Sequence, residues 1–199
     1  MTKKQKSILI AMSIGDGHLH KYSDTKSVEL MLAHSTKQKD YLIWKVNLAR
    51  RIFGGKPNKI AEFNNNYYPG IRWSKADNYF RIIRKWLYKN GKKVISKKIL
   101  DKLTPMGIAI WYMDDGNLTL HKRNRKIHAR EIYLNTYCSK NEAEIIQKWF
   151  MEKYNIRFRV AKNKGKFRLA CNTANTKRFI KIVKPYIIPS MQYKIDMRY

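Results

Sequence analysis

The chain has 199 residues, of which 44% are hydrophobic and 13% aromatic, so it can bury the core of one compact domain or of two small ones. The chain has 43 Lys and Arg residues but only 14 Asp and Glu residues, which gives a formal net charge of +29. Its surface therefore cannot be balanced in charge, and a polyanionic binding partner is predicted. Nucleic acid is the expected polyanion, because neutralised phosphates release counterions and give salt-dependent affinity.

The sequence lacks the features of a membrane or secreted protein. No apolar segment reaches the roughly 18 to 20 residues of a membrane span, and the N-terminal residues lack the small-residue cleavage site of a signal peptide. We therefore expect no membrane association and a mature chain that starts near Met1. The Lys-, Asn- and Ile-rich usage suggests an A·T-rich genome, so we expect an intracellular location, in an organelle matrix (mitochondrion or plastid) or a bacterial or phage cytoplasm.

Cysteine and histidine do not indicate a zinc site. Cys138 and Cys171 form no CxxC pair, which also argues against a disulfide framework and favours a reducing compartment. The five histidines, among them His18 and His20, lack the Cys or His partners of a zinc module. We interpret them as exposed polar strand residues.

The first predicted helix, about Lys4 to Gly15, is apolar from Ile8 onward and ends on Asp16 and Gly17. A carboxylate at a helix C-terminus loses a few tenths of a kcal/mol, because the helix dipole is already negative there. A second apolar helix, about Met106 to Asp114, ends on Asp-Gly in the same way. Asp-Gly is also a common turn dipeptide, so an ordinary helix-ending turn is the alternative interpretation.

The elements after each Asp-Gly repeat in the same order: strands, a helix, a hairpin, a helix and a basic segment. In the first half, the β-rich segment, helix, hairpin strands and second helix are predicted at Ser27–Ser35, Thr36–Phe53, Asn58–Phe63 with Gly70–Ser74, and Asn78–Tyr88. In the second they are Glu131–Ser139, Lys140–Tyr154, Ile156–Lys162 with Lys166–Asn172, and Thr176–Ile187. Ser35 and Ser139 can each cap the following helix, and Ser139 with Glu142 fits a capping box.

We therefore predict an α+β fold of two pseudo-symmetric αββαββα repeats. The N-terminal subdomain is residues 1–96 and the C-terminal subdomain is residues 106–199. The linker, 97–105, has no Gly/Ser-rich stretch, which favours rigid packing of the two units about a pseudo-twofold axis.

The two motif helices are the apolar segments common to both halves, so we expect them to form the interface. Ala11 and Gly15 offer one helix a small-residue face, while Gly107 and Ala109 do less of this on the other. Side-by-side packing would bring Asp16 and Asp115 together, where like charges repel and shift each other's pKa. A divalent cation relieves that repulsion. Mg²⁺ prefers such oxygen ligands, and in a nucleic-acid-binding protein it suggests phosphodiester hydrolysis.

The segments "LIAMSIGDG" and "IAIWYMDDG" resemble the two motifs of a LAGLIDADG homing endonuclease, in the single-chain branch with two motifs. The resemblance covers nearly the whole chain and includes the lead-in "LTPMGIAIWYMDDG" and the C-terminal "KPYIIPSMQYKI". It implies motif helices at the interface and two antiparallel sheets that form a saddle over DNA. It also implies a monomer that binds double-stranded DNA at a long asymmetric site and cuts both strands across the minor groove, leaving 3′ overhangs.

The resemblance also implies the catalytic residues. Asp16 and Asp115 match the motif-terminal acidic position and would bind Mg²⁺ or Mn²⁺, with the carbonyl groups of Gly15 and Asp114 as further ligands. Asp114 departs from the small residue usual at its position, so catalysis is assigned to Asp115.

A basic residue near each attacking water is implied as well, and it maps to Lys93 and Lys194. The separation of Asp16 from Lys93 nearly equals that of Asp115 from Lys194, which supports the pairing independently. Lys92 is the alternative to Lys93 as the basic residue of the first half.

Strand alternation predicts the DNA-contacting side chains, because one face of each sheet covers the core and alternate residues face the ligand. The predicted contacts are Lys59, Arg72, Ser74, Arg157, Arg159, Lys166, Arg168 and Asn172. Arg and Asn suit base edges and Lys more often meets phosphate. The segment His121–Arg130 is expected to be a loop that contacts the DNA backbone. A solvated basic strand face is the alternative interpretation.

Two other functions use the same fold. An intron RNA maturase is the main alternative, because an RNA-binding surface is also basic. A DNA-binding regulator without cleavage is disfavoured, because a binding protein has no need to crowd Asp16 and Asp115.

Overall fold

The computed structural model describes residues 1–22, 27–54, 59–64 and 69–198. The first half contains α1 (Lys3–Ile14), β1 (His18–Lys21), β2 (Val28–Ser35), the 3₁₀ helix η1 (Thr36–Gln38), α2 (Lys39–Phe53), β3 (Ala61–Asn64), β4 (Pro69–Ala76), α3 (Asn78–Leu87), β5 (Tyr88–Lys89) and β6 (Lys92–Lys93). Helix α4 (Lys97–Leu100) follows. The second half contains α5 (Pro105–Asp115), β7 (Gly116–Arg123), β8 (Lys126–Cys138), α6 (Lys140–Tyr154), β9 (Arg159–Asn163), β10 (Lys166–Cys171), α7 (Thr173–Val183), η2 (Lys184–Tyr186) and η3 (Pro189–Lys194). The predicted α+β fold with a repeated αββαββα order is confirmed.

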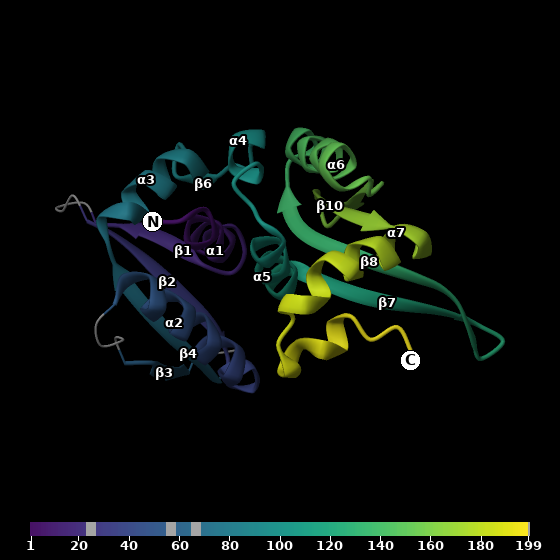
Figure 1. The fold of residues 1–199 in the computed structure, drawn as a ribbon, viewed down its shortest axis with the longest axis horizontal. Coiled ribbons are helices and arrows are strands. Elements are labelled where there is room, and N and C mark those ends of the chain that lie inside the picture. Colours follow the sequence, from purple (N-terminus) through teal and green to yellow (C-terminus); the bar gives the residue numbers. More distant parts are fainter. Residues whose placement is uncertain (23–26, 55–58, 65–68, 199) are drawn as a thin grey trace.

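Helices α1 and α5 lie side by side at the centre, between the two sheets (Figure 1). Near their N-termini, the hydroxyl of Ser7 accepts a hydrogen bond from the backbone N–H of Thr104 at 2.8 Å, and a Cβ on Gly107 would lie 2.2 Å from that hydroxyl oxygen. Near their C-termini, a Cβ on Gly15 would lie 2.3 Å from a carboxylate oxygen of Asp114. The helices are therefore parallel, and Gly107 permits close approach as much as Gly15 does, contrary to the prediction.

Burial of the motif helices explains their composition. Every residue of α1 from Ser7 to Ile14 is buried, as is every residue of α5 from Gly107 to Met113. A helix that is apolar on all sides suits a position between two packed units, where no face meets water. Segment 97–105 adds to this core, because Ile99 and Leu100 of α4 are fully buried. No helix in the described part of the chain is long and apolar enough to span a bilayer.

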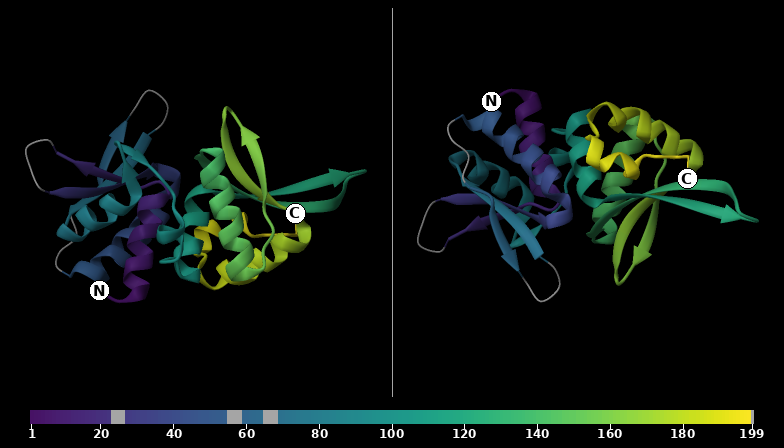
Figure 2. Two further views of the ribbon diagram at one scale, coloured as in Figure 1. Left: turned by 90° about the horizontal axis from the view of Figure 1, so that it is seen from above. Right: turned by 90° about the horizontal axis from the view of Figure 1, so that it is seen from below.

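The two sheets have the same antiparallel strand order, β1-β2-β4-β3 and β7-β8-β10-β9, and both spread away from the central helices (Figure 2). Their registers also correspond. Leu32 of β2 lies opposite Trp73 of β4, and Leu134 of β8 lies opposite Leu169 of β10. One residue before Trp73 and Leu169, Arg72 and Arg168 occupy equivalent positions, each opposite an alanine of the edge strand.

Several local predictions are corrected by the structure. Ser35 does not cap α2 with its side chain, because η1 intervenes and Gln38 is the N-cap residue. Ser139 and Glu142 do form the predicted capping box of α6. The segment predicted as a loop from His121 to Arg130 is instead the end of a long hairpin, in which only residues 124 and 125 form the turn between β7 and β8. Residues 65–68 of the predicted first-half turn lie outside the described residues.

Candidate active site and nucleic-acid interface

Asp16 is the first residue after the C-cap of α1, and its side chain is 40% exposed. Gly17 follows because the chain turns tightly against the helix end: its N–H donates to the carbonyl of Met12 at 3.0 Å, and a Cβ would lie only 2.2 Å from that oxygen. Gly116 is equally constrained, since its Cβ would lie 2.0 Å from the ring of Tyr112. Each Asp-Gly thus needs glycine for space.

Asp115 ends α5, and the indole N–H of Trp111 donates to its carboxylate at 2.9 Å. Burial, together with the charges of Asp114 and Asp16, raises the pKa of Asp115 to about 8. Burial and the charge of Asp114 also raise the pKa of Asp16. The predicted crowding of carboxylates at one end of the motif helices is therefore present, and a divalent cation would relieve it.

Lys93 and Lys194 bind the helix ends in the same way in both halves. The ammonium of Lys93 donates to the carbonyls of Gly15 at 2.9 Å and Gly17 at 2.6 Å. That of Lys194 donates to the carbonyls of Met113 at 2.5 Å and Asp114 at 3.4 Å. Burial lowers the pKa of both lysines, although the nearby aspartates oppose the shift. Both lysines therefore lie at the carboxylate ends of the motif helices. The assignment of each lysine to one aspartate stays a prediction, because the charge of Asp115 acts on Lys93 more than that of Asp16, and the charge of Asp16 acts on Lys194 more than that of Asp115.

Lys92, the rival of Lys93, has a different environment. It is exposed in β6, whereas Lys93 is partly buried and contacts the end of α1. The geometry favours Lys93.

The carboxylate of Asp114 is buried and accepts three hydrogen bonds from protein groups. It accepts hydrogen bonds from the ammonium of Lys45, from the hydroxyl of Tyr41 at 2.8 Å and from the backbone N–H of Asp16 at 3.2 Å. The side chains of Lys45 and Asp114 are both 0% exposed. Oδ1 takes two of these hydrogen bonds and Oδ2 takes the third.

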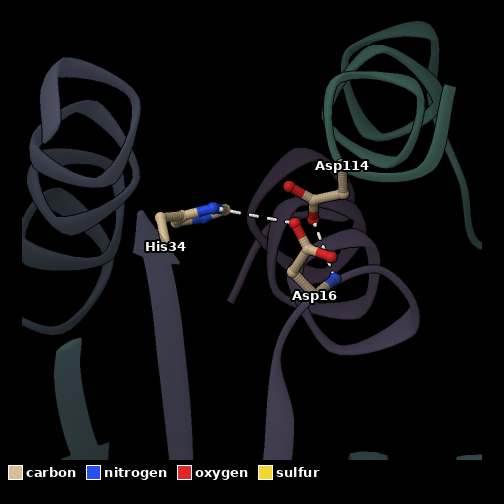
Figure 3. Close-up of side chains that lie close together, drawn as sticks. All are labelled: Asp16, His34 and Asp114. Carbon is tan, nitrogen blue, oxygen red and sulfur yellow. Dashed lines mark hydrogen bonds and ion pairs between the residues drawn. The ribbon is translucent and has the colours of Figure 1, made fainter. Parts of the chain in front are cut away.

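His34 of β2 extends this cluster and corrects the interpretation of all histidines as exposed. It is buried, with Nε2 3.2 Å from the ammonium of Lys45 and Nδ1 3.7 Å from the carboxylate of Asp16. Asp16 faces Asp114 on one side and His34 on the other (Figure 3). Burial and the charge of Lys45 lower the pKa of His34 to about 4, so the imidazole is neutral at neutral pH.

Sequence reasoning missed Lys45 and His34, yet both carried a signal. Lys45 shares the buried face of α2 with Leu42 and Ala49, at helical spacing. His34 alternates in β2 with the buried residues Leu30 and Leu32. A charged or polar residue within a buried stripe needs a polar partner. His34 finds its partners in the first half, whereas Lys45 also needs Asp114 of the second half.

The potential cation ligands are oxygen atoms. Ligand atoms of Asp16, His34 and Asp114 lie within 4.8 Å of one another, but Lys45 and Tyr41 already occupy Oδ1 of Asp114. The carboxylates of Asp16 and Asp115 and the adjacent helix-end carbonyls form the remaining set. Crowded carboxylates with raised pKa values and carbonyl oxygens fit a hard divalent cation such as Mg²⁺.

The first sheet brings its three predicted DNA contacts together. Lys59, Arg72 and Ser74 line one groove, together with Tyr22 and Glu29. Arg72 and Ser74 lie on β4, whereas Lys59 precedes β3 rather than belonging to it. The groove is therefore a basic strand face with one carboxylate in it.

The second sheet arranges its predicted contacts around Tyr133. The guanidinium of Arg168 lies 4.2 Å from the centre of the Tyr133 ring, and Arg159 forms an ion pair with Glu131 at 3.2 Å. Lys166 is exposed at the start of β10.

Two of the predicted strand residues are not in strands. Arg157 precedes β9 and is exposed. Asn172 caps α7, and its amide oxygen accepts the backbone N–H of Asn175 at 3.1 Å. Because this cap already uses the amide oxygen, the structure gives no support to base reading by Asn172.

Comparisons with known proteins cover the whole chain. A model of the LAGLIDADG DNA endonuclease family matches residues 6–179. The chain is 28% identical to a RecA protein of Mycolicibacterium chitae, with 100% of this chain and 48% of that protein aligned. It is also 28% identical to cytochrome b mRNA maturase bI2 of Saccharomyces cerevisiae, over 95% of this chain and 46% of that protein. It spans about half the length of these curated relatives.

A shorter relative is covered more fully. The chain is 27% identical to probable intron-encoded endonuclease 1 of Wickerhamomyces canadensis, over 98% of this chain and 85% of that protein. Among solved structures, the homing endonuclease I-WcaI bound to its DNA recognition sequence is similar with a TM-score of 0.82 and 26% identity, over 100% of this chain and 88% of that one. Because the family match runs from α1 into α7, and so spans both motif helices and both sheets, this chain belongs to the LAGLIDADG DNA endonuclease family.

Proposed function

We propose that this protein is a site-specific DNA endonuclease that acts as a monomer and uses Mg²⁺ or Mn²⁺ to cut both strands across the minor groove, leaving 3′ overhangs. The observation that carries the proposal is the crowding of Asp16, Asp114 and Asp115 at one end of the paired motif helices, where the partly buried Lys93 and the buried Lys194 bind the helix-end carbonyls. The similarity to I-WcaI, which was solved on its DNA recognition sequence, supports a DNA substrate.

The carboxylates of Asp16 and Asp115 would hold the divalent cations. The carbonyls of Gly15 and Asp114 are further candidate ligands, since each keeps a lone pair beside its lysine hydrogen bond. A bound divalent cation supplies Lewis-acid stabilisation and lowers the pKa of a water molecule. A similar fold, that of an I-DmoI variant, was solved with its target DNA in the presence of manganese, which supports a divalent ion.

Lys93 and Lys194 would serve as the basic residues near the attacking waters. Their hydrogen bonds to helix-end carbonyls hold each ammonium beside the phosphodiester position, where it can orient a water molecule or balance phosphate charge. The lowered pKa of each also makes proton exchange near neutral pH easier than for an exposed lysine.

The two basic strand faces would bind a long asymmetric target. Arg72 and Arg168, at equivalent registers, would read base edges in the major groove, with Lys59 and Arg159 beside them. Residues 1–96 and 106–199, joined by 97–105, then each cover one part of the duplex. The two faces carry different side chains, which suits an asymmetric rather than a palindromic site.

The test is sequencing of products from a randomised double-stranded DNA library, incubated with Mg²⁺ or with chelator. We expect one cleaved target family with 3′ overhangs, seen only with the divalent ion. The Asp16→Asn, Asp115→Asn double variant should lose cleavage and keep binding. Asp40→Asn makes the same chemical change at an exposed position in the first turn of α2 and should cleave normally. Absence of any Mg²⁺-dependent product would refute the proposal.

An intron RNA maturase is the second candidate function. The match to a cytochrome b mRNA maturase over 95% of this chain favours it, as does a basic groove away from the sheets, lined by Asn47, Arg50 and Arg51 of α2. The test is splicing of a host intron with and without the protein and with the double Asp variant. Splicing that persists without cleavage would separate the two functions.

The match to RecA does not lead us to propose ATP-dependent recombination. The sequence contains no G-x-x-x-x-G-K-[ST] phosphate-binding loop, and the described fold is the repeated αββαββα unit.

A further inference from the structure

Asn135 of β8 lies between a predicted base-reading arginine and a catalytic aspartate. Its side-chain amide N–H₂ donates to the backbone carbonyl of Asp115 at 3.0 Å and to the side-chain oxygen of Asn117 at 2.9 Å. Its own side-chain oxygen accepts from the guanidinium of Arg168 at 3.5 Å. A single amide therefore connects the strand face to the end of motif helix α5.

Arg168 is held in place by its neighbours, but one of its N–H groups lacks a hydrogen-bond partner among the described residues. Its guanidinium rests on the ring of Tyr133, whose hydroxyl donates to Glu131 at 2.6 Å, and Glu131 in turn pairs with Arg159. The Nε–H of Arg168 is buried and has no hydrogen-bond partner among the described residues. A buried donor without a partner is unfavourable, so this orientation of the guanidinium depends on its contacts with Tyr133 and Asn135.

The first half lacks this connection. By strand register Arg72 corresponds to Arg168, and the residue of β2 opposite Arg72 is Ala33, which corresponds to Asn135. An alanine side chain cannot form an amide bridge. In the second half the register of β8 against β10 also shifts just beyond Leu134, between the partners Phe167 and Leu169. Such irregularities commonly redirect a side chain, here beside the position of Asn135.

We propose that Asn135 is a positioning residue that couples base reading by Arg168 to the placement of the Asp115 backbone. This inference rests on the proposed endonuclease function. In the second half, a target that Arg168 does not recognise would be cleaved more slowly. In the first half, a target that Arg72 does not recognise would be bound more weakly. The bridge ends on the residue that carries the proposed cation ligand, so a small displacement there changes the geometry of the reacting phosphate.

The test is a pair of double-mutant cycles on the target recovered from the library. The first cycle combines Asn135→Ala with Arg168→Ala, and the matched cycle combines Asn135→Ala with Arg72→Ala. Single-turnover cleavage rates at saturating protein report the chemical step, and DNA titration without divalent ion reports binding. Urea unfolding shows whether each variant folds, and Asn135→Ser, which keeps a short polar group, replaces the alanine variant if that one does not fold.

We expect Asn135→Ala to slow single-turnover cleavage by about five- to tenfold while DNA affinity changes by less than about twofold, as for loss of one useful hydrogen bond. Arg168→Ala should then cause little further loss of rate in the Asn135→Ala background. In the matched cycle the effects of Arg72→Ala and Asn135→Ala should multiply.

Other outcomes overturn the inference. If the effects of the two single substitutions on the cleavage rate multiply in both cycles, Asn135 is an ordinary structural residue. If Asn135→Ala weakens DNA binding as much as it slows cleavage, Asn135 is an ordinary binding residue. A wild-type protein that cleaves its target but shows no coupling refutes this inference alone. A wild-type protein that cleaves no target refutes the proposed function and the inference with it.

Discussion

The side chains of Lys45 and Asp114 form a fully buried ion pair between the two halves of the molecule. Lys45 comes from α2 of the first half and Asp114 from motif helix α5 of the second. Removing two charges from water is costly, and the pair persists because Tyr41, His34 and the backbone N–H of Asp16 complete its hydrogen bonds. At the position equivalent to Asp114, the first motif has Gly15, so the candidate active site is asymmetric.

We predict that Lys45→Met destabilises the protein by about 3 to 5 kcal/mol, because it leaves the Asp114 carboxylate buried without its counter-ion. The double variant Lys45→Met, Asp114→Ala should recover a large part of this loss, since neither charge remains. Urea unfolding of the two variants and the wild type measures the difference. A Lys45→Met protein within about 1 kcal/mol of wild type would show that the pair is not needed.

Asp16→Asn should abolish cleavage while DNA binding persists. Without metal, its free energy of unfolding should be unchanged or slightly higher, because one of the crowded carboxylates is neutralised. Chemical unfolding with chelator present, beside a DNA-binding titration, tests both statements. A marked loss of stability would instead favour a purely structural role for the Asp-Gly turn.

Mg²⁺ should raise the thermal midpoint of unfolding of the wild type. A ligand that binds only the folded state stabilises it by about 1.4 kcal/mol at ten times its dissociation constant. The Asp16→Asn, Asp115→Asn double variant should show no such rise, because both carboxylate ligands are gone. Calorimetry with Mg²⁺ against NaCl of equal ionic strength separates specific binding from screening of the +29 charge.

Lys93→Met should slow cleavage by about 100-fold, the typical contribution of a positioned acid–base group. The control is built into the chain, because Lys92 is its exposed neighbour in β6. Lys92→Met removes the same charge and should change the single-turnover rate by less than about threefold, through weaker phosphate contact only. Equal losses in the two variants would mean that Lys93 contributes only general charge.

Glu131 should make stability depend on pH in the acid range. Burial opposes its ionisation, but hydrogen bonds from Tyr133, Arg159 and His121 outweigh that effect and lower its pKa below the ordinary 4.5. A lowered carboxylate pKa gives stability that is present above the ordinary value and lost as pH falls through the folded-state value.

Glu131→Gln should therefore be less stable than wild type by about 1 kcal/mol at pH 7, and the difference should shrink as pH falls below the ordinary glutamate pKa and through the lowered folded-state value. Urea unfolding at several pH values checks this, with Glu144→Gln, at an exposed i,i+4 pair, as the control expected to show little change. A difference that does not vary with pH would contradict the assignment.

Much of the site could be predicted because its signals are local or repeat along the chain. The apolar motif helices, the Asp-Gly ends and the alternating basic strands are patterns of short range. The internal repeat pointed to Lys93 and Lys194, which both bind carbonyls at the ends of the motif helices. Errors occurred where local geometry departs from the ideal pattern. Gln38 rather than Ser35 caps α2, and Asn172 caps a helix instead of extending a strand.

The sequence by itself determined the repeat and the fold class, because helical and strand periodicity decide which faces are buried. Only the tertiary structure decided what satisfies the buried polar groups. Lys45 meets Asp114, and Asn135 meets Asp115 and Arg168, through contacts between segments far apart in the chain. Such partners depend on how two halves pack and where a strand register shifts. The spacing of residues within either half does not indicate which of these partners will meet.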